Sequence, residues 1–228
     1  MKIELKHLDR YMFVDPAGRP RGNTGGLRRQ RARQAIVVIG VDWLNRVFVL
    51  DSWAGRLPAS QFVSKIVEVY TRWTPRSCGI EENAMQELFA DLVKDEARRQ
   101  LGHVNMRGIT QPTNLDKDWR IRNHLEPVIN QGRLFLVSGN AQVDLETEIR
   151  TFPTGRTKDL VDALASAVSM APARTSHRAV NQEVEDVLRY LRDTGAPMWY
   201  IQQRSEELRQ EAKLALRPAE WARGGVRG

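Results

Sequence analysis

The sequence predicts an α/β fold: a mixed β-sheet with an antiparallel meander plus parallel strands, flanked by helices, with a helical C-terminal tail. Two observations support this fold class. Three apolar, β-branched runs follow one another between residues 11 and 53, and shorter apolar runs then alternate with amphipathic helical segments. The chain of 228 residues, 41% hydrophobic and 28% charged, suits one large domain or one domain with an appendage.

The meander is predicted from three runs that are separated by turn signals. Residues 11–14 (YMFV) form the first strand, which stops at Asp15 and Pro16. Residues 35–41 (AIVVIGV) form a second, buried strand, and residues 46–53 (RVFVLDSW) form a third. Only four residues link the second strand to the third, so we expect these strands to pair antiparallel.

From residue 60 onward the apolar residues recur with helical spacing, interrupted by short strands. The predicted helices are 60–74, 84–101, one from residue 117 that Pro127 kinks, 141–152 and 158–170, and the predicted strands are 77–80, 103–109 and 133–137. In the second helix we expect Leu88, Leu92 and Leu101 to face inward. Two amphipathic stretches follow Pro172, so the predicted domains are residues 1–172 and a helical, partly flexible tail, residues 173–228.

Several classes of protein are excluded by composition. The longest apolar run is far shorter than the ~20 residues of a membrane span, and the first ten residues lack the apolar region of a signal peptide. The single cysteine, Cys78, forms neither an internal disulfide nor a Cys/His zinc cluster. We therefore expect a reduced, cytoplasmic protein in which any metal ion is bound by oxygen atoms.

The basic charge is concentrated in one glycine-rich segment. The formal net charge is +7, and no acidic residue occurs between Asp15 and Asp42. The arginines of this segment are Arg19, Arg21, Arg28, Arg29, Arg31 and Arg33. A solvated basic loop is one interpretation; contact with phosphate groups, which the flat guanidinium donors suit, is favoured.

Carboxylates stand at the positions where α/β sheets usually build their sites. Asp15 and Glu81 each end an apolar strand, and Asp162 lies on an otherwise apolar helix, one turn after Asp159. If these acids meet, they repel one another unless a cation neutralises them, and oxygen ligands with open positions suit Mg²⁺ or Mn²⁺. Two such ions would support phosphodiester cleavage.

Each acid also has another explanation when it is taken alone. Asp15 before Pro16 is typical of a turn, Glu81 or Glu82 suits a helix N-terminus, and Asp159 is a candidate N-cap. Asp162 would be satisfied by a salt bridge to an arginine. The metal-site hypothesis therefore depends on the arrangement of the acids and not on any one of them.

Five segments, taken in order, resemble the C-terminal nuclease domain of the large terminase subunit of tailed double-stranded DNA bacteriophages. They are YMFVDPAGRPRG, QAIVVIGVDWLNRVFVLDSWAGR, SCGIEENAMQELFADLV, DKDWRIRNHLEPVINQGRLFL and EIRTFPTGRTKDLVDALASAV. The resemblance covers roughly residues 11–170. It implies a ribonuclease-H-like fold and metal-dependent endonucleolytic cutting of concatemeric viral DNA during genome packaging.

The resemblance also implies roles for particular residues. The catalytic, metal-binding acids of the family fall on Asp15, Glu81 and Asp162, with Asp159 as an auxiliary ligand and Glu82 as the neighbour that would replace Glu81. Many relatives carry an aspartate before the second strand, where this chain has Arg33 and Gln34. The implied cofactors are two divalent cations, Mg²⁺ or Mn²⁺.

The partners that the resemblance implies are double-stranded DNA, the packaging ATPase domain, the small terminase subunit and the portal, in the cytoplasm of the infected bacterial host. The chain contains no Walker A motif, so we expect no ATPase activity in it. The residues expected to hold DNA phosphates are Arg28, Arg29, Arg31, Arg33, Lys117, Arg120 and Lys158. Such contacts give little sequence preference.

Two other functions remain open from the sequence. Holliday-junction resolvases and transposases use the same kind of acid cluster on a ribonuclease-H-like fold. A non-enzymatic DNA-docking module, whose acids are structural, would also explain the basic charge.

Overall fold

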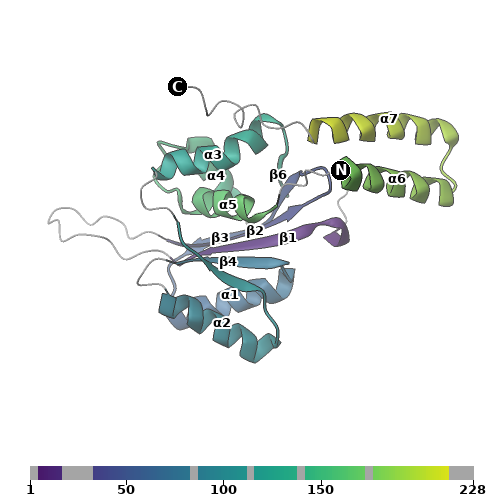
Figure 1. Cartoon of the computed structure of the whole chain (residues 1–228). Helices are drawn as coiled ribbons and strands as arrows, with labels where there is room; N and C mark the ends of the chain where they lie inside the picture. Colours follow the sequence, from purple (N-terminus) through teal and green to yellow (C-terminus); the bar gives the residue numbers. More distant parts are fainter. Residues whose placement is uncertain are drawn as a thin grey trace, which may run out of the picture. The chain divides into compact units, whose positions relative to one another are not determined.

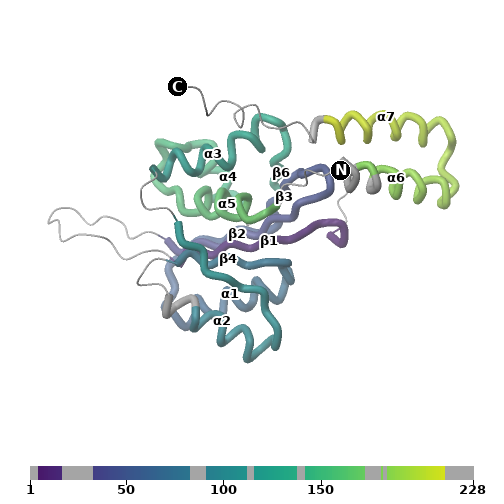
Figure 2. The backbone as a smooth tube through the Cα atoms, viewed as in Figure 1, coloured from purple at the N-terminus to yellow at the C-terminus, as the bar shows by residue number. Residues whose placement is uncertain are grey.

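The computed structural model describes residues 5–16, 33–82, 87–111, 116–137, 142–172 and 177–215 (Figure 1), and Figure 2 follows the same backbone as a tube. Within these ranges, the first compact unit lies before Pro172 and excludes Asp42–Arg46, which group with the residues from Pro172 onward. Each unit is described by itself. The expected division into domains at residue 172 stays a prediction.

The first unit is built on one six-stranded mixed sheet. Its strands are β1 (Asp9–Asp15), β2 (Gln34–Val41), β3 (Val47–Gly55), β4 (Ser77–Glu81), β5 (Met106–Ile109) and β6 (Leu134–Leu136). Their order in the sheet is β5-β4-β1-β2-β3-β6. The β1–β2 and β2–β3 pairs are antiparallel, whereas β4 is parallel to both β1 and β5, and β6 is parallel to β3.

Helices cover both faces of this sheet (Figure 1). One face carries α1 (Ala59–Trp73) and α2 (Glu87–Leu101); the other carries α3 (Lys117–Asn130), α4 (Val143–Thr151) and α5 (Asp159–Met170). A 3-10 turn (Leu5–His7) precedes β1. The predicted α/β class, a mixed sheet with an antiparallel meander plus parallel strands flanked by helices, is confirmed, and Pro127 lies inside α3.

Alternation along the strands divides the core into two apolar layers. In β1, Tyr11 and Phe13 pack with α3, α4 and α5, whereas Met12 and Val14 pack with α1 and α2. Successive side chains of a strand point to opposite faces, so the face of any residue in β1 follows from its position. The next residue on the Tyr11 and Phe13 face is Asp15.

One prediction about the core was wrong. Leu92 is 61% exposed and Leu101 is 36% exposed, so neither faces inward as expected. Val93 and Ala97 of α2 are buried instead, on the layer that contains α1. Leu92 is therefore one residue before the buried stripe of α2, whereas Leu101 continues the spacing of that stripe but is the last residue of the helix. The side chain of Leu88 is not among those that the structure describes.

The second unit contains the turn Asp42–Arg46 and two helices, α6 (His177–Asp193) and α7 (Met198–Ala215). They confirm the two helical stretches predicted for the tail. The buried residues of its apolar core are Leu44, Val184, Leu188, Ile201, Leu208 and Ala212. Among the helices described in either unit, none has the length and apolar character needed to cross a membrane.

Candidate active site

Two of the predicted acids lie at the ends of neighbouring parallel strands. In the β1–β4 pair, Val14 is opposite Ile80, so Asp15 and Glu81 follow side by side. Asp15 shares the sheet face of Tyr11 and Phe13, and Gly79, two residues before Glu81, lies against Phe13 and Met170 of the same layer. Strand alternation therefore directs both carboxylates to the face that α5 covers.

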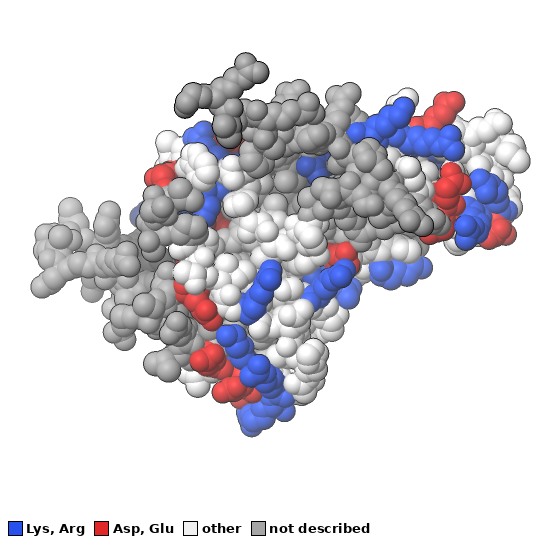
Figure 3. Space-filling view, viewed as in Figure 1, with Lys and Arg blue, Asp and Glu red and all other residues white. Residues whose placement is uncertain are grey.

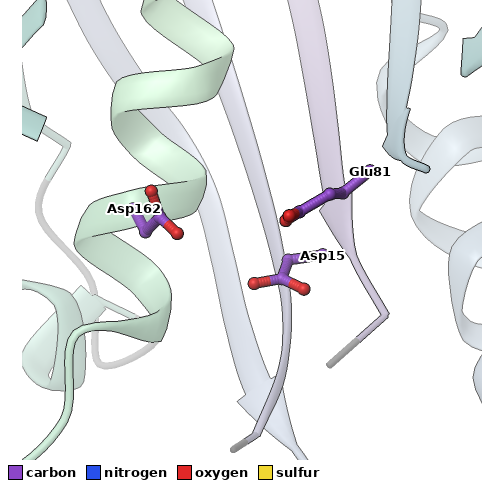
Figure 4. A group of neighbouring side chains, drawn as sticks. All are labelled: Asp15, Glu81 and Asp162. Carbon is purple, nitrogen blue, oxygen red and sulfur yellow. The ribbon is translucent and has the colours of Figure 1, made fainter. Parts of the chain in front are cut away.

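The third acid comes from the first turn of α5. This helix packs on β1 and β2, and Asp162 is only 3% exposed there. One carboxylate oxygen of each of Asp15, Glu81 and Asp162 lies within 4.8 Å of those of the other two. Figure 4 shows the three side chains turned toward one another. We call these three residues the acidic cluster.

Two cations of α3 neutralise the Asp162 carboxylate. Lys117 Nζ lies 2.8 Å from Asp162 Oδ2, and Arg120 Nη2 donates to Asp162 Oδ1 at 2.5 Å. Burial lowers the pKa of Lys117, but attraction to Asp162, Asp15 and Asp159 outweighs it, so that the pKa is raised overall. Arg120 therefore pairs with Asp162, as the alternative explanation of this acid expected. Lys117 is attracted to Asp15 and Asp159 as well as to Asp162.

The other two candidate ligands lie apart from the acidic cluster. Glu82 points the opposite way from Glu81: it accepts from Lys94 Nζ of α2 at 3.3 Å, and it packs where a Cβ at Gly108 would lie. Asp159 Oδ2 accepts from Arg33 Nε at 3.2 Å and from the Arg33 backbone N–H at 3.3 Å. As placed, these carboxylates serve ion pairs, and their roles as metal ligands stay predictions.

A buried acid that the sequence did not single out holds the start of α5. Glu148 of α4 is 3% exposed; its Oε2 accepts from the backbone N–H groups of Leu160 at 2.8 Å and Val161 at 3.1 Å. Its Oε1 accepts from Arg33 Nη2. The N-cap residue of α5, Lys158, makes no side-chain cap, so Glu148 supplies one from a separate helix. The sequence feature that could have identified Glu148 is its position on the same face of the helix as the apolar residues Leu145 and Ile149.

The predicted DNA-binding residues that the structure describes are all ion-paired. Arg33 contacts Asp144, Glu148 and Asp159, and Lys158 Nζ lies 2.7 Å from Asp118 Oδ1. Arg28, Arg29 and Arg31 lie outside the described residues. On the face seen in Figure 3, described basic side chains lie beside acidic ones. Lys117, whose side chain is 47% exposed, is the most accessible of the four described cations.

The acidic cluster fits a hard divalent cation. All three donors are carboxylate oxygens, the type that Mg²⁺ and Mn²⁺ prefer. Three carboxylates at this separation repel one another without a counter-charge, and the structure places the Lys117 ammonium against one of them. Asp15, Glu81 and Asp162 could therefore hold a metal ion between the strand ends and α5.

No family model matches this chain, and no curated protein matches it. Among solved structures, it is similar to the large terminase nuclease from thermophilic phage G20c, with 14% identity, coverage of 73% of this chain and 84% of that one, and a TM-score of 0.46. It is also similar to T. thermophilus RuvC in complex with a Holliday junction substrate (14% identity, 70% and 91% coverage, TM-score 0.41). A second Thermus thermophilus RuvC structure gives 17% identity, the same coverage and a TM-score of 0.38.

Proposed function

We propose that this chain is a metal-dependent endonuclease that hydrolyses phosphodiester bonds of DNA. The observation that carries the proposal is the acidic cluster: three acids, remote in sequence, with oxygens within 4.8 Å of one another at the ends of β1 and β4 and on α5. Such convergence is improbable for acids that serve only as turn or cap residues. It supports a site that binds a cation and a phosphate.

The roles that we propose follow from the position of each residue. Asp15, Glu81 and Asp162 hold two divalent cations, Mg²⁺ or Mn²⁺. When bound, such ions activate an attacking water and stabilise the leaving oxygen of the phosphodiester. Asp159 is proposed as the auxiliary ligand, and Glu82 as the alternative to Glu81; both would first have to leave their present ion pairs with Arg33 and Lys94.

DNA binding is proposed to use the phosphate backbone. The residues proposed to contact the phosphates are Arg28, Arg29, Arg31, Arg33, Lys117, Arg120 and Lys158. Backbone contacts position a duplex without reading its bases, so cutting would show little sequence preference. Of the four described candidate cations, Lys117 is the most exposed and also contacts the acidic cluster directly.

The biological role that we propose rests on the sequence motifs. Their order and spacing resemble the nuclease domain of large terminases, so the substrate would be concatemeric viral DNA, cut during genome packaging in the infected host. The partners would be the packaging ATPase domain, the small terminase subunit and the portal.

The decisive experiment incubates the intact protein with supercoiled plasmid and, separately, with a synthetic four-way junction, in Mg²⁺, Mn²⁺ or EDTA. Metal-dependent linearisation and degradation of plasmid is expected. The variants Asp15→Asn, Glu81→Gln and Asp162→Asn should each lower cutting at least ~100-fold, since even the outer partners of metal ligands are typically worth 10–100-fold. Glu96→Gln, which removes a carboxylate of α2 that pairs with Arg99, is the matched control and should cut normally.

Other outcomes distinguish the remaining candidates. Cutting confined to the four-way junction would indicate a resolvase. Binding of both DNAs without cutting in any metal would indicate a DNA-docking module and would end the nuclease proposal. Full activity in Asp162→Asn would show that the ion pairs to Lys117 and Arg120 are the whole role of that carboxylate.

A further inference from the structure

Two cations of α3 contact the acidic cluster at Asp162. Lys117 and Arg120 lie three residues apart on α3 and so project from one side of the helix toward Asp162. One contacts Oδ2 at 2.8 Å and the other Oδ1 at 2.5 Å, so both carboxylate oxygens of Asp162 are engaged. A metal ion that binds Asp162 must therefore displace or share one of these contacts.

The two cations differ in how easily they can leave. The Arg120 side chain is 12% exposed and enclosed between α3 and α5, whereas the Lys117 side chain is 47% exposed. A lysine ammonium is a point charge on a flexible four-carbon stem, while an arginine holds its partner through a rigid planar group. Lys117 is thus the contact that gives way at the least cost.

The charge of Lys117 interacts with two members of the acidic cluster. It contacts Asp162 at 2.8 Å, and attraction to Asp15 and to the neighbouring Asp159 adds to this contact. The cationic form of Lys117 is thereby stabilised by more than one of the carboxylates that would hold a metal. A divalent ion at the same acids would repel this ammonium while competing with it for Oδ2.

We propose that Lys117 is the counter-ion of the metal-free site, that metal binding displaces it from Asp162 Oδ2, and that its presence lowers the affinity for metal. Released from Asp162, the exposed ammonium at the start of α3 is free to contact the phosphate of a bound DNA. Lys117 acts in this way as a positioning residue that couples metal loading to DNA binding. The inference rests on the metal site of the proposed function.

The test measures Mn²⁺ affinity without DNA, by isothermal titration calorimetry of the intact protein. Lys117→Met should bind Mn²⁺ roughly five- to tenfold more tightly than the unaltered protein, because the competing ion pair is gone. Lys117→Arg, which keeps the charge, should retain the original affinity. Lys65→Met is the control: it removes an equally positive side chain from an exposed pair with Glu68 on α1 and should change nothing.

The gain in unfolding temperature that Mn²⁺ produces is a second readout, and a purely structural role of Lys117 would leave this gain unchanged. Lys117→Met should unfold at a lower temperature than the unaltered protein in EDTA, because Asp162 loses one of its two cationic partners, and should gain more stability from Mn²⁺. Lys117→Gln serves as a replacement if the methionine variant is poorly folded by circular dichroism. Equal or weaker Mn²⁺ binding by the variant overturns the counter-ion role while leaving the nuclease proposal intact. If the unaltered protein itself binds no Mn²⁺, both fail.

Discussion

The carboxylate of Glu148 holds the start of α5 in place beside the candidate site, and removing its charge gives the most informative test. Glu148 belongs to α4 and accepts hydrogen bonds from backbone N–H groups at the start of α5. It also accepts a hydrogen bond from Arg33, just before β2, so it links three parts of the chain. Glu148→Gln keeps the shape of the side chain but removes its charge. The amide must also present a donor either to Arg33 or to the N–H groups of Leu160 and Val161.

The expected loss is worked from these contacts. Removing a helix cap costs ~1 kcal/mol. Removing one partner of a buried ion pair costs about 3–5 kcal/mol. Arg33 retains Asp144 and Asp159, so we expect the loss of this pair to cost less than about 3 kcal/mol. Together we expect about 3 kcal/mol. For a chain of this size the melting temperature then falls by roughly 6–12 °C.

The assay is thermal and urea unfolding of the intact protein, followed by a method that reports on the sheet-containing unit. Glu146→Gln is the matched control, because Glu146 lies on the same helix and makes an exposed pair with Arg150 at 2.7 Å. That pair should contribute less than about 0.5 kcal/mol. A loss for Glu148→Gln below about 1 kcal/mol, or equal to that of the control, would refute the capping role.

Three further predictions concern titration and DNA binding. Burial and the nearby Arg120 lower the pKa of His124 below 6.5, so the unfolded chain takes up a proton before the folded chain does and stability should fall from about pH 6.5 downward. His124→Gln should reduce the change in the free energy of urea unfolding between about pH 7 and 5.5. The same pH dependence in the variant and the unaltered protein would contradict this. Burial raises the pKa of the Cys78 thiol from 9.0 to about 12, so stability should decline above pH 9 as the unfolded thiol ionises, and less so in Cys78→Ala. Lys158→Met should reduce the slope of log affinity for duplex DNA against log salt by about 0.9, measured by fluorescence anisotropy in EDTA; an unaltered slope would remove Lys158 from the DNA contacts.

The convergence of the acidic cluster was predictable because it depends on strand geometry. An apolar run that ends in an acid fixes where Asp15 and Glu81 stand, and the parallel register of β1 and β4 brings two such ends together. Alternation then separates Glu81 from Glu82, sending one to α5 and the other to α2. The sequence alone could not choose between these neighbours, because the choice depends on which residue of β4 lies opposite β1.

The missed features depend on contacts between helices, which local patterns do not encode. A glutamate on the apolar face of α4 would normally indicate that this face is not buried. Glu148 is buried because the N-terminus of α5 and Arg33 donate hydrogen bonds to its carboxylate. The pairing of Lys117 with Asp162 requires α3 to lie against α5, and nothing in the spacing of either helix specifies that neighbour.

The ion pairs change how the net charge of +7 should be understood. The first turn of α5 carries Asp159 and Asp162, which favour a helix N-terminus, and Glu148 adds a third carboxylate there. Arg33 and Arg120 are both committed to this group of acids and are shielded from solvent. Both arginines would have to leave these acids before they could contact a DNA phosphate, and the most exposed of the four described candidate cations is Lys117. Because the exchange of an acid for a phosphate requires the acids to gain another counter-charge, we expect DNA to bind more tightly when a divalent metal is present than in EDTA.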